Sequence, residues 1–395
     1  MNAEPVVAEP VTAPIYYYVD HTSRFEHNSG IQRCVRALAR ALLELGQPLV
    51  PVVWDRQRQC LAPASAQALA HLARWSGPAA QAWSPWPDAP AGPRPNWLVI
   101  VELVSGPHNP SRNQLLAAAR PLNLQLAWLF HDAIPLRQAQ LYGAAASQAA
   151  QCHATYMANL ASYRLVFCNS QTSRGQLLAF LQEQGIAAAP ELEQRIRPLP
   201  LAEDFGGERP PAPTANDGPL ELLCVSTLEP RKNHRGLLKA LGWLHSQGRH
   251  HWRLQLVGWA AEGWVVALVE RAQRLGLPVH WHGRADDAAL ARLYRQADLC
   301  VYPSLEEGFG LPVAESLWQR RPCLCSGEGA LGERAAAGGC LTVDTGDWRA
   351  IAAGLERLLL EPELRQRLVQ DTEARCFRRW QNVAAELLED LACAP

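Results

Sequence analysis

The sequence predicts an α/β protein with two domains, each built around a mostly parallel β-sheet. The chain has 395 residues, which is enough for two or three domains of ordinary size. Short apolar runs bounded by turn residues alternate with segments of helical periodicity, which is the pattern of βα units. Two such series occur, and a stretch rich in Pro, Gly and Ala at 206–219 separates them. This composition is typical of an exposed linker, so we place the domain boundary there.

The expected strands fall into two groups, one on each side of this linker. In the first half of the chain, the apolar runs that we predict as strands are 15–19, 49–54, 97–104, 124–130 and 165–168. In the second half they are 220–225, 252–257, 279–281, 299–302 and 322–325. Two groups of strands imply two separate sheets.

The chain therefore divides into a tail, two domains, a linker and a final helix. We expect a disordered tail at 1–14, an N-terminal domain at 15–205, the linker at 206–219, a C-terminal domain at 220–375 and a C-terminal helix at 376–395. The tail lacks the basic start and the long apolar run of a secretory signal.

Composition and charge exclude several classes of protein. Hydrophobic residues make up 48% of the chain and charged residues 19%, which argues against global disorder. The formal net charge of -1 provides no field that would draw the protein onto nucleic acid or an anionic membrane. The 11 cysteines are an odd number without regular spacing, so a reducing cytosol is the simpler location. The run at 97–104 is too short to span a bilayer, so we expect a soluble, cytoplasmic protein.

A glycine loop between a strand and a helix is the most informative motif. Residues 302–315 read Tyr-Pro-Ser-Leu-Glu-Glu-Gly-Phe-Gly-Leu-Pro-Val-Ala-Glu, and Pro312 stands where a first helical residue is favoured. The N–H groups at such a helix start can cradle a phosphate. The carboxylates of Glu307 and Glu315 flank the cradle, so each could accept hydrogen bonds from sugar hydroxyls. The alternative is a tight turn in which Glu315 complements the helix dipole, and the residues alone leave the two interpretations equally open.

A pair of cations follows the first strand of the second domain. Residues 226–233 read Ser-Thr-Leu-Glu-Pro-Arg-Lys-Asn, so Arg231 and Lys232 stand just before a helix whose expected N-cap is Asn233. Side-chain charge and helix N-terminus can then act on one anion, such as a diphosphate. The alternative is a solvated surface pair, which is the commoner situation for two such residues.

Two positions in the first domain stand where a ligand is expected. His131 follows the strand 124–130, and in open parallel sheets ligands bind beyond the carboxyl ends of strands. Gly30 opens an amphipathic helix in the first βα loop. The alternatives are a histidine satisfied by local backbone and an ordinary helix start. Asp132, Ser170 and Arg174 are weaker candidates in similar loops.

These motifs together resemble glycosyltransferase family 4. Its Glu, seven residues, Glu motif matches Glu307 and Glu315, with Glu306 as a bystander, and the resemblance is nearly continuous from 220 to about 345. It implies the GT-B fold, in which two Rossmann-like domains face each other across a cleft and the final helix returns to the N-terminal domain. It also implies that the N-terminal domain binds the acceptor and the C-terminal domain the nucleotide-sugar donor.

The resemblance also implies roles for individual residues. Arg231 and Lys232 would act on the donor diphosphate, Glu307 and His131 on the donor sugar, and Glu315 on the ribose. Thr227 occupies a position where many family members carry a further arginine. The remaining residues that we expect to bind the donor are Gly30, Thr227, Gly258, Arg284, Gly308, Phe309, Gly310 and Leu311.

Several motifs are absent from the sequence. No Gly-x-Gly-x-x-Gly opens the first helix, and no Gly-Lys-Ser/Thr loop occurs, so dinucleotide and P-loop sites are not expected. No Asp-x-Asp is present to hold a divalent cation, which favours a site in which cations and a helix dipole replace the metal. The pairs His280/His282 and Cys323/Cys325 lack further ligands at metal-site spacing. We expect no metal and no cofactor apart from the nucleotide-sugar co-substrate.

The expected function is a retaining, metal-independent transfer of a hexose to a glycan hydroxyl in O-antigen, capsule or exopolysaccharide synthesis. We expect GDP-mannose as the donor; a rhamnosyl- or glucosyltransferase using a dTDP- or UDP-sugar is the alternative. A lipid-linked glycan acceptor would bring the enzyme to the inner membrane face. An alternative of another class is a catalytically idle GT-B protein that binds nucleotide or glycan, and an epimerase or phosphorylase could share the fold.

Overall fold

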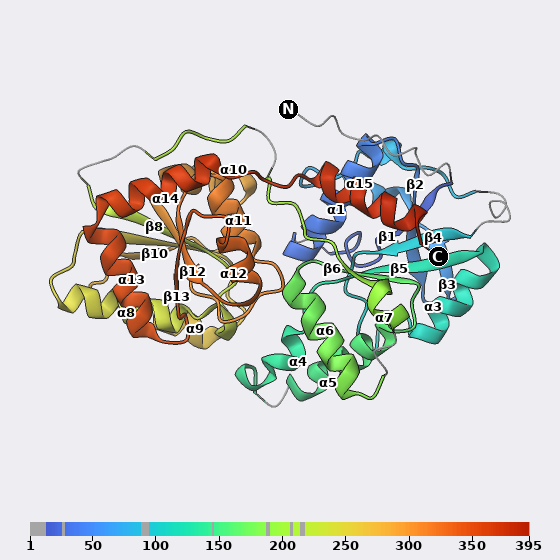
Figure 1. Ribbon diagram of the computed structural model, residues 1–395, viewed down its shortest axis with the longest axis horizontal. Coiled ribbons are helices and arrows are strands. Elements are labelled where there is room, and N and C mark those ends of the chain that lie inside the picture. The colour runs from blue at the N-terminus through green and yellow to red at the C-terminus, as the bar shows by residue number, and fades with distance from the viewer. Residues whose placement is uncertain are drawn as a thin grey trace. The chain divides into compact units, whose positions relative to one another are not determined.

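The computed structural model describes residues 13–25, 28–87, 95–143, 146–186, 190–205, 208–213 and 218–394 (Figure 1). The chain divides into two compact units. Unit 1 comprises Met1–Ala139, Ala144–Ala202 and Arg378–Pro395, and unit 2 comprises Gln140–Gly143 and Glu203–Phe377. The expected tail at 1–14 lies almost entirely outside the described residues, as does part of the expected linker.

Unit 1 contains a seven-stranded sheet with the order β3-β2-β1-β4-β5-β6-β7. Only β3 is antiparallel to its neighbour. The strands are β1 Ile15–Tyr18, β2 Leu49–Asp55, β3 Cys60–Pro63, β4 Asn96–Ile100, β5 Leu124–Phe130, β6 Leu165–Cys168 and β7 Ile196–Pro198. The helices are α1 Gly30–Glu44, α2 Ala66–Leu72, α3 Arg112–Ala119, α4 Ile134–Arg137, α5 Ala146–Leu160, α6 Gln171–Glu183, α7 Pro190–Arg195 and α15 Trp380–Ala392.

Unit 2 contains a six-stranded, fully parallel sheet with the order β10-β9-β8-β11-β12-β13, which is the strand order of a Rossmann fold. The strands are β8 Leu220–Val225, β9 Trp252–Val257, β10 Val279–Trp281, β11 Leu299–Tyr302, β12 Cys323–Ser326 and β13 Cys340–Val343. The helices are α8 His234–Ser246, α9 Gly263–Arg274, α10 Asp287–Gln296, α11 Leu311–Trp318, α12 Gly329–Ala335, α13 Trp348–Leu360 and α14 Pro362–Ala374. The predicted fold class, with two Rossmann-like parallel-sheet domains as in GT-B proteins, is confirmed.

The centre of the unit 2 sheet is buried on both faces, which explains why β11 and β12 are buried throughout, whereas β9, nearer the edge, carries the polar Arg253 and Gln255. Leu222 and Leu223 are neighbours on β8, yet they belong to different hydrophobic clusters because successive side chains of a strand point to opposite faces. Side chains of α8, α9 and α13 join the cluster of Leu222, and side chains of α10, α11 and α12 join that of Leu223. Helices therefore cover the sheet on both sides.

All ten predicted strands are present, together with three short strands that were not predicted, β3, β7 and β13. The predicted strand 97–104 was also too long, because β4 ends at Ile100. Beyond it, the buried carboxylate of Glu102 accepts hydrogen bonds from the backbone N–H groups of His21 (2.8 Å) and Thr22 (2.6 Å). The chain after β4 is thus tied to the loop after β1 instead of extending the sheet.

The change from unit 1 to unit 2 occurs at Glu203, a few residues before the expected linker. The Glu203 carboxylate is bound to Arg334 (2.8 Å) and Arg375 (2.9 Å) of unit 2, and these buried ion pairs attach this segment to the second unit. At the other end of the chain, α15 packs on α1 of unit 1, and Gln381 Nε2 donates to Glu44 (2.7 Å; Figure 1).

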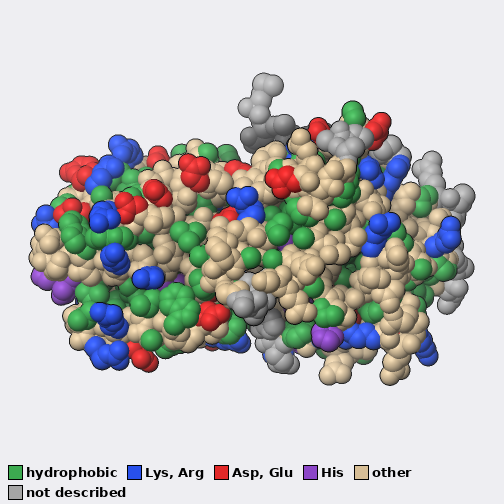
Figure 2. Space-filling view, turned by 90° about the horizontal axis from the view of Figure 1, so that it is seen from below, with side chains coloured by type: hydrophobic (Ala, Val, Ile, Leu, Met, Phe, Trp, Pro, Cys, Tyr) green, Lys and Arg blue, Asp and Glu red, His purple; other side chains and the backbone are tan. Residues whose placement is uncertain are grey.

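Charges of both signs are mixed on the surface, and the cysteines form no disulfide bond. Basic and acidic side chains are interspersed on the face shown in Figure 2. All 11 cysteines are unpaired, and most are buried. Within the described part of the chain, no helix has both the length and the hydropathy needed to cross a lipid bilayer.

Candidate functional site

The glycine loop has the predicted arrangement of strand, loop and helix. Strand β11 ends at Tyr302, and α11 begins at Leu311 with Gly310 as its N-cap. Pro312 is therefore the second helical residue, one position later than expected. Gly310 has φ 92°, a left-handed conformation that an L side chain rarely adopts. The first-turn N–H groups of α11 lack helical partners, as in any α-helix, so the loop offers hydrogen-bond donors to an anion.

The space around Gly310 leads to a first prediction. A Cβ at this position would lie 2.7 Å from Cδ2 of the buried Leu331. We expect Gly310→Ala to lower the free energy of unfolding by at least the ~1–2 kcal/mol of a left-handed residue. It should also weaken binding of a nucleotide diphosphate, because the loop must shift away from Leu331. Thermal unfolding and nucleotide titration would measure both effects.

Gly276→Ala is the matched control. Gly276 also has a positive φ, 78°, but no atom lies within 4 Å of the added Cβ. This variant should lose stability without losing nucleotide affinity. Equal nucleotide affinities of the two variants would contradict a role for the Gly310 loop in binding.

A buried charge cluster surrounds Glu307, just before the glycine loop. Its Oε1 atom lies 2.6 Å from Lys232 Nζ and 2.8 Å from Arg231 Nη1. The Tyr302 hydroxyl donates to the same oxygen at 2.8 Å, and the Ser304 hydroxyl donates to it as well. The structure thus brings together the two predicted cations and the first predicted carboxylate, which are far apart in the sequence.

The charges in this cluster stabilise one another. Burial raises the pKa of Glu307, but Lys232 and Arg231 lower it more strongly, to about 2. Burial lowers the pKa of Lys232, and the neighbouring Glu307 opposes that change. Arg231 also donates to the carboxylate of Glu229 and to the backbone carbonyl of Glu306, both at 2.7 Å. The two cations are therefore balanced by two carboxylates, those of Glu229 and Glu307.

Three members of the cluster were not foreseen: Tyr302, Ser304 and Glu229. Tyr302 Oη accepts from Lys232 Nζ at 2.7 Å and thereby fixes the ammonium group. A signal was available for Tyr302 and Ser304, because polar groups at the carboxyl end of a parallel strand lie where ligands bind. Glu306 was expected to be a bystander, but its backbone carbonyl accepts a hydrogen bond from Arg231.

The adjacent strand ends carry Thr227, Gly258 and Arg284. A Cβ at position 258 would lie 1.9 Å from the Ser226 carbonyl oxygen, so only glycine fits at this position. The Gly258 N–H donates to the Gly283 carbonyl at 2.8 Å, which joins the ends of β9 and β10. Arg284 is exposed and lies over the Trp259 ring, with 5.4 Å between its guanidinium carbon and the ring centroid.

Glu315 and Phe309 are more deeply buried than the predicted donor contacts suggest. Glu315 is 3% exposed, and its Oε2 accepts a hydrogen bond from Tyr294 Oη at 2.8 Å. Phe309 is 4% exposed and packs beneath the Arg334 guanidinium, 4.4 Å from the ring centroid. Because Glu203 and Arg375 form a buried ionic network with Arg334, this network fixes the ring from one side.

His131 and Gly30 belong to unit 1, and they are described within that unit alone. His131 is buried, and its Nε2 lies 2.6 Å from the Val101 carbonyl oxygen. Burial lowers the pKa of His131, which favours the neutral ring at neutral pH. A carbonyl can only accept, so Nε2 carries the proton and Nδ1 the lone pair. Gly30 is the first residue of α1, and Ser29 caps that helix.

The weaker candidates of unit 1 have structural partners. Asp132 accepts at 3.0 Å from the N–H of Ile134, the first residue of α4. Ser170 caps α6 by accepting from the Ser173 N–H at 3.0 Å. Arg174 donates to the Ile196 carbonyl at 2.8 Å.

In the described ranges, His, Cys, Asp and Glu form no group of three or more that could hold a metal ion.

Part of the chain is similar in sequence to known glycosyltransferases. Residues 208–375, which make up most of unit 2, match the family model described as glycosyl transferases group 1. The O-antigen chain mannosyltransferase B of Escherichia coli is 38% identical over 148 residues, which cover 36% of this chain and 38% of the relative. The serotype-specific mannosyltransferase WbdA of Escherichia coli is 23% identical over 317 residues, which cover 76% of this chain and 36% of the relative. The chain thus spans little more than a third of either relative.

Solved structures share the fold over nearly the whole chain. Sucrose-phosphate synthase from Thermosynechococcus elongatus has a TM-score of 0.66 at 19% identity and covers 97% of this chain and 100% of its own. HepE of Anabaena, solved with UDP and glucose, has a TM-score of 0.63 at 15% identity and covers 96% of this chain and 99% of its own. At these identities the likeness establishes the fold.

Proposed function

We propose that this protein is a retaining glycosyltransferase that moves mannose from GDP-mannose to a hydroxyl group of a surface-polysaccharide glycan, without a metal ion. The observation that carries the proposal is the buried cluster of Lys232, Arg231 and Glu307 within a glycosyl transferases group 1 domain. Mannose transfer is supported by the mannosyltransferase relatives, which match part of this chain at 23% to 38% identity.

The donor diphosphate would be bound by directed N–H groups more than by net charge. The carboxylates of Glu229 and Glu307 balance the two cations, so the cluster carries no net formal charge. An ammonium group has three N–H donors, and Lys232 uses one on Tyr302 and one on Glu307. The third can reach a phosphate oxygen. Together with the first-turn N–H groups of α11, it would stabilise the charge that develops on the departing diphosphate.

Retention of configuration would follow from attack on the face from which the diphosphate leaves. The site cluster of unit 2 presents cations, hydroxyls and carboxylates bound to cations, and Glu307 is a poor nucleophile because Lys232 and Arg231 hold its pKa low. We therefore propose front-face attack by the acceptor hydroxyl, with the leaving phosphate taking its proton. Contacts of His131 with the donor sugar and of Glu315 with the ribose stay predictions.

A nucleotide-sugar panel tests the donor and the metal requirement together. Thermal unfolding is measured with GDP-mannose, UDP-glucose and dTDP-rhamnose, each with and without EDTA. A ligand at about 100 times its dissociation constant stabilises the folded state by ~2.7 kcal/mol. We expect GDP-mannose to give the largest rise and EDTA to leave it unchanged. Loss of the rise in EDTA would overturn metal-independent binding.

Turnover separates a transferase from the alternatives. A transferase releases GDP from GDP-mannose when a mannose-containing oligosaccharide is added, and NMR of the product reports the anomeric configuration. Rapid release without acceptor would indicate a hydrolase, and binding without any release an idle nucleotide-binding protein. An inverted product would contradict the retaining mechanism.

A further inference from the structure

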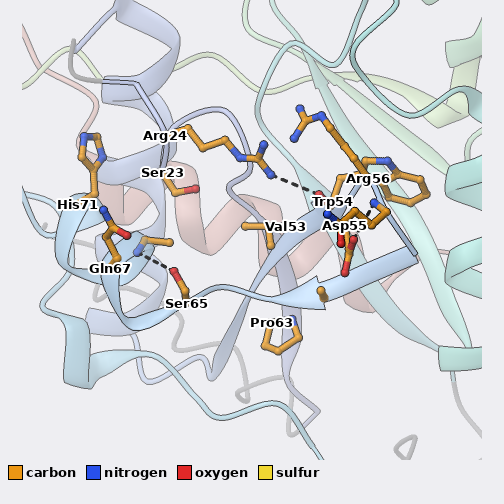
Figure 3. Close-up of a pocket in the computed structure, with 13 residues that line it drawn as sticks. Ser23, Arg24, Val53, Trp54, Asp55, Arg56, Pro63, Ser65, Gln67 and His71 are labelled. Carbon is orange, nitrogen blue, oxygen red and sulfur yellow. Dashed lines mark hydrogen bonds between the residues drawn. The ribbon is translucent and has the colours of Figure 1, made fainter. Parts of the chain in front are cut away.

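A pocket of about 650 Å³ lies within unit 1, and its lining includes none of the residues that we have assigned to the donor (Figure 3). It opens among the loop after β1, the end of β2, strand β3 and the first turns of α2. The loops after β1 and β2 leave the carboxyl edge of the parallel sheet, where ligands bind in open α/β folds. Pockets of ~300–1,000 Å³ are typical of small-molecule sites.

Two arginines are held at this pocket by one buried carboxylate. Asp20 is 2% exposed; its Oδ1 accepts from Arg24 and from the Trp54 N–H, and its Oδ2 accepts from Arg56 at 3.2 Å. Arg24 also donates to the Trp54 carbonyl, and Arg56 to the His108 carbonyl. Both side chains remain more than 40% exposed, so each guanidinium is fixed in place while its outer edge stays accessible.

The rest of the pocket combines hydrogen-bond acceptors with an apolar floor. Asp55 Oδ1 accepts from the N–H groups of Gln57 (2.9 Å) and Arg58 (3.0 Å), which fixes its carboxylate. The exposed amide of Gln67 lies on the first turn of α2, and Figure 3 shows it on the side of the pocket away from Asp55. Val53 and Ala62 are paired across β2 and β3 and form an apolar floor.

This chemistry suits a neutral, hydroxyl-rich ligand better than an anion. Asp20 is bound to both Arg24 and Arg56, and Asp55 pairs with Arg58 at 4.0 Å, so each guanidinium group already has a carboxylate partner and an anion would also face Asp55. A sugar ring has hydroxyls that donate to carboxylates and accept from guanidinium groups, and its C–H faces can pack on Val53 and Ala62. Donors and acceptors fixed around an apolar floor provide both kinds of contact.

We propose that this pocket binds a neutral sugar unit of the acceptor glycan. The proposal rests on the proposed function for its statement that the bound glycan is the acceptor. It adds Arg24, Asp55, Arg56 and Gln67 as residues that recognise that glycan, in the domain that the resemblance assigned to the acceptor without indicating individual residues.

Direct binding to the full chain tests the pocket without requiring turnover. Saturation-transfer NMR and titration calorimetry use disaccharides of mannose, rhamnose, glucose and galactose, with inorganic phosphate as the anionic probe. For the disaccharide that binds, Gln67→Ala should weaken binding about 3- to 10-fold, the value of one hydrogen bond. Asp55→Asn keeps an Oδ1 acceptor for the turn and should weaken binding about 10-fold or more, because charged hydrogen bonds are stronger.

Arg120→Gln is the control, since Arg120 is an exposed arginine of unit 1 that does not line the pocket. It should bind the disaccharide as the parent does. Unchanged binding in both Gln67→Ala and Asp55→Asn, or no binding of any disaccharide, would overturn the proposal. So would binding of phosphate that is lost in Arg56→Gln, because the pocket would then be an anion site.

The stabilisation by GDP-mannose should be the same in Gln67→Ala as in the parent chain. If the disaccharide binds as expected but no nucleotide-sugar does, the proposed function fails while the sugar pocket stands. If GDP-mannose binds and is turned over but the pocket variants bind the glycan normally, only the pocket fails.

Discussion

Replacing Lys232 by methionine is expected to reduce kcat by about 10²–10³-fold, the usual cost of removing one preorganised donor to developing negative charge. The side chain is buried, and its ammonium group touches Tyr302 Oη and Glu307 Oε1. Methionine preserves the length and the packing of the side chain but removes all three N–H donors. Steady-state release of GDP from GDP-mannose in the presence of acceptor measures the effect.

The matched control is the same substitution at Lys239, since Lys232 and Lys239 are the only lysines in the sequence. Lys239 is exposed on α8, and its ammonium lies over the Trp348 ring, 4.5 Å from the centroid. Lys239→Met should therefore keep the turnover of the parent chain. If the two variants turn over donor at the same rate, Lys232 does not act on the leaving group.

Replacing Glu307 by glutamine is expected to lower the free energy of unfolding by about 3–5 kcal/mol, since removing one partner of a buried ion pair leaves its charge uncompensated. Lys232 would lose its carboxylate partner and keep only neutral acceptors, the Tyr302 hydroxyl and the glutamine oxygen, while Arg231 would keep Glu229. Glutamine has nearly the same shape, so a change in packing does not account for the loss. Chemical denaturation at neutral pH measures it.

The same substitution should alter the dependence of stability on pH. The pKa of Glu307 falls from an ordinary 4.5 to about 2 on folding. The folded state therefore binds fewer protons, and the carboxylate contributes stability above about pH 4.5 that is lost as the pH falls towards 2. The parent chain should lose more stability over this range than Glu307→Gln does.

Glu306→Gln is the control for both measurements. It preserves the carbonyl that accepts from Arg231, and it leaves the Lys232–Glu307 pair intact. Its stability and its pH profile should stay close to those of the parent. A Glu307→Gln protein that is as stable as Glu306→Gln would show that the charge cluster contributes nothing to folding.

Much of the fold was predictable because it depends on local patterns. Ten strands and their two groups follow from short apolar runs, since the strands of a sheet covered on both faces are mostly apolar. Strands β3, β7 and β13 were missed because they lie at the edges of their sheets and are only partly buried, so they lack the continuous apolar run of an inner strand. The early end of β4 was missed because Glu102 reaches N–H groups 80 and 81 residues away in the chain.

The sequence by itself determined the two-sheet α/β fold, the glycine loop and the residue types of the donor site, because each depends on neighbours within a few positions of the chain. Only the tertiary structure decided that Lys232 and Arg231 meet Glu307 across 75 residues or more, and that two carboxylates balance them. The physical reason is the sheet order: β8 and β11 are adjacent parallel strands, so the loops after them leave the same edge and their side chains meet there. The pocket around Arg24 and Arg56 arises in the same way, from loops that follow β1 and β2, and no local pattern reveals it.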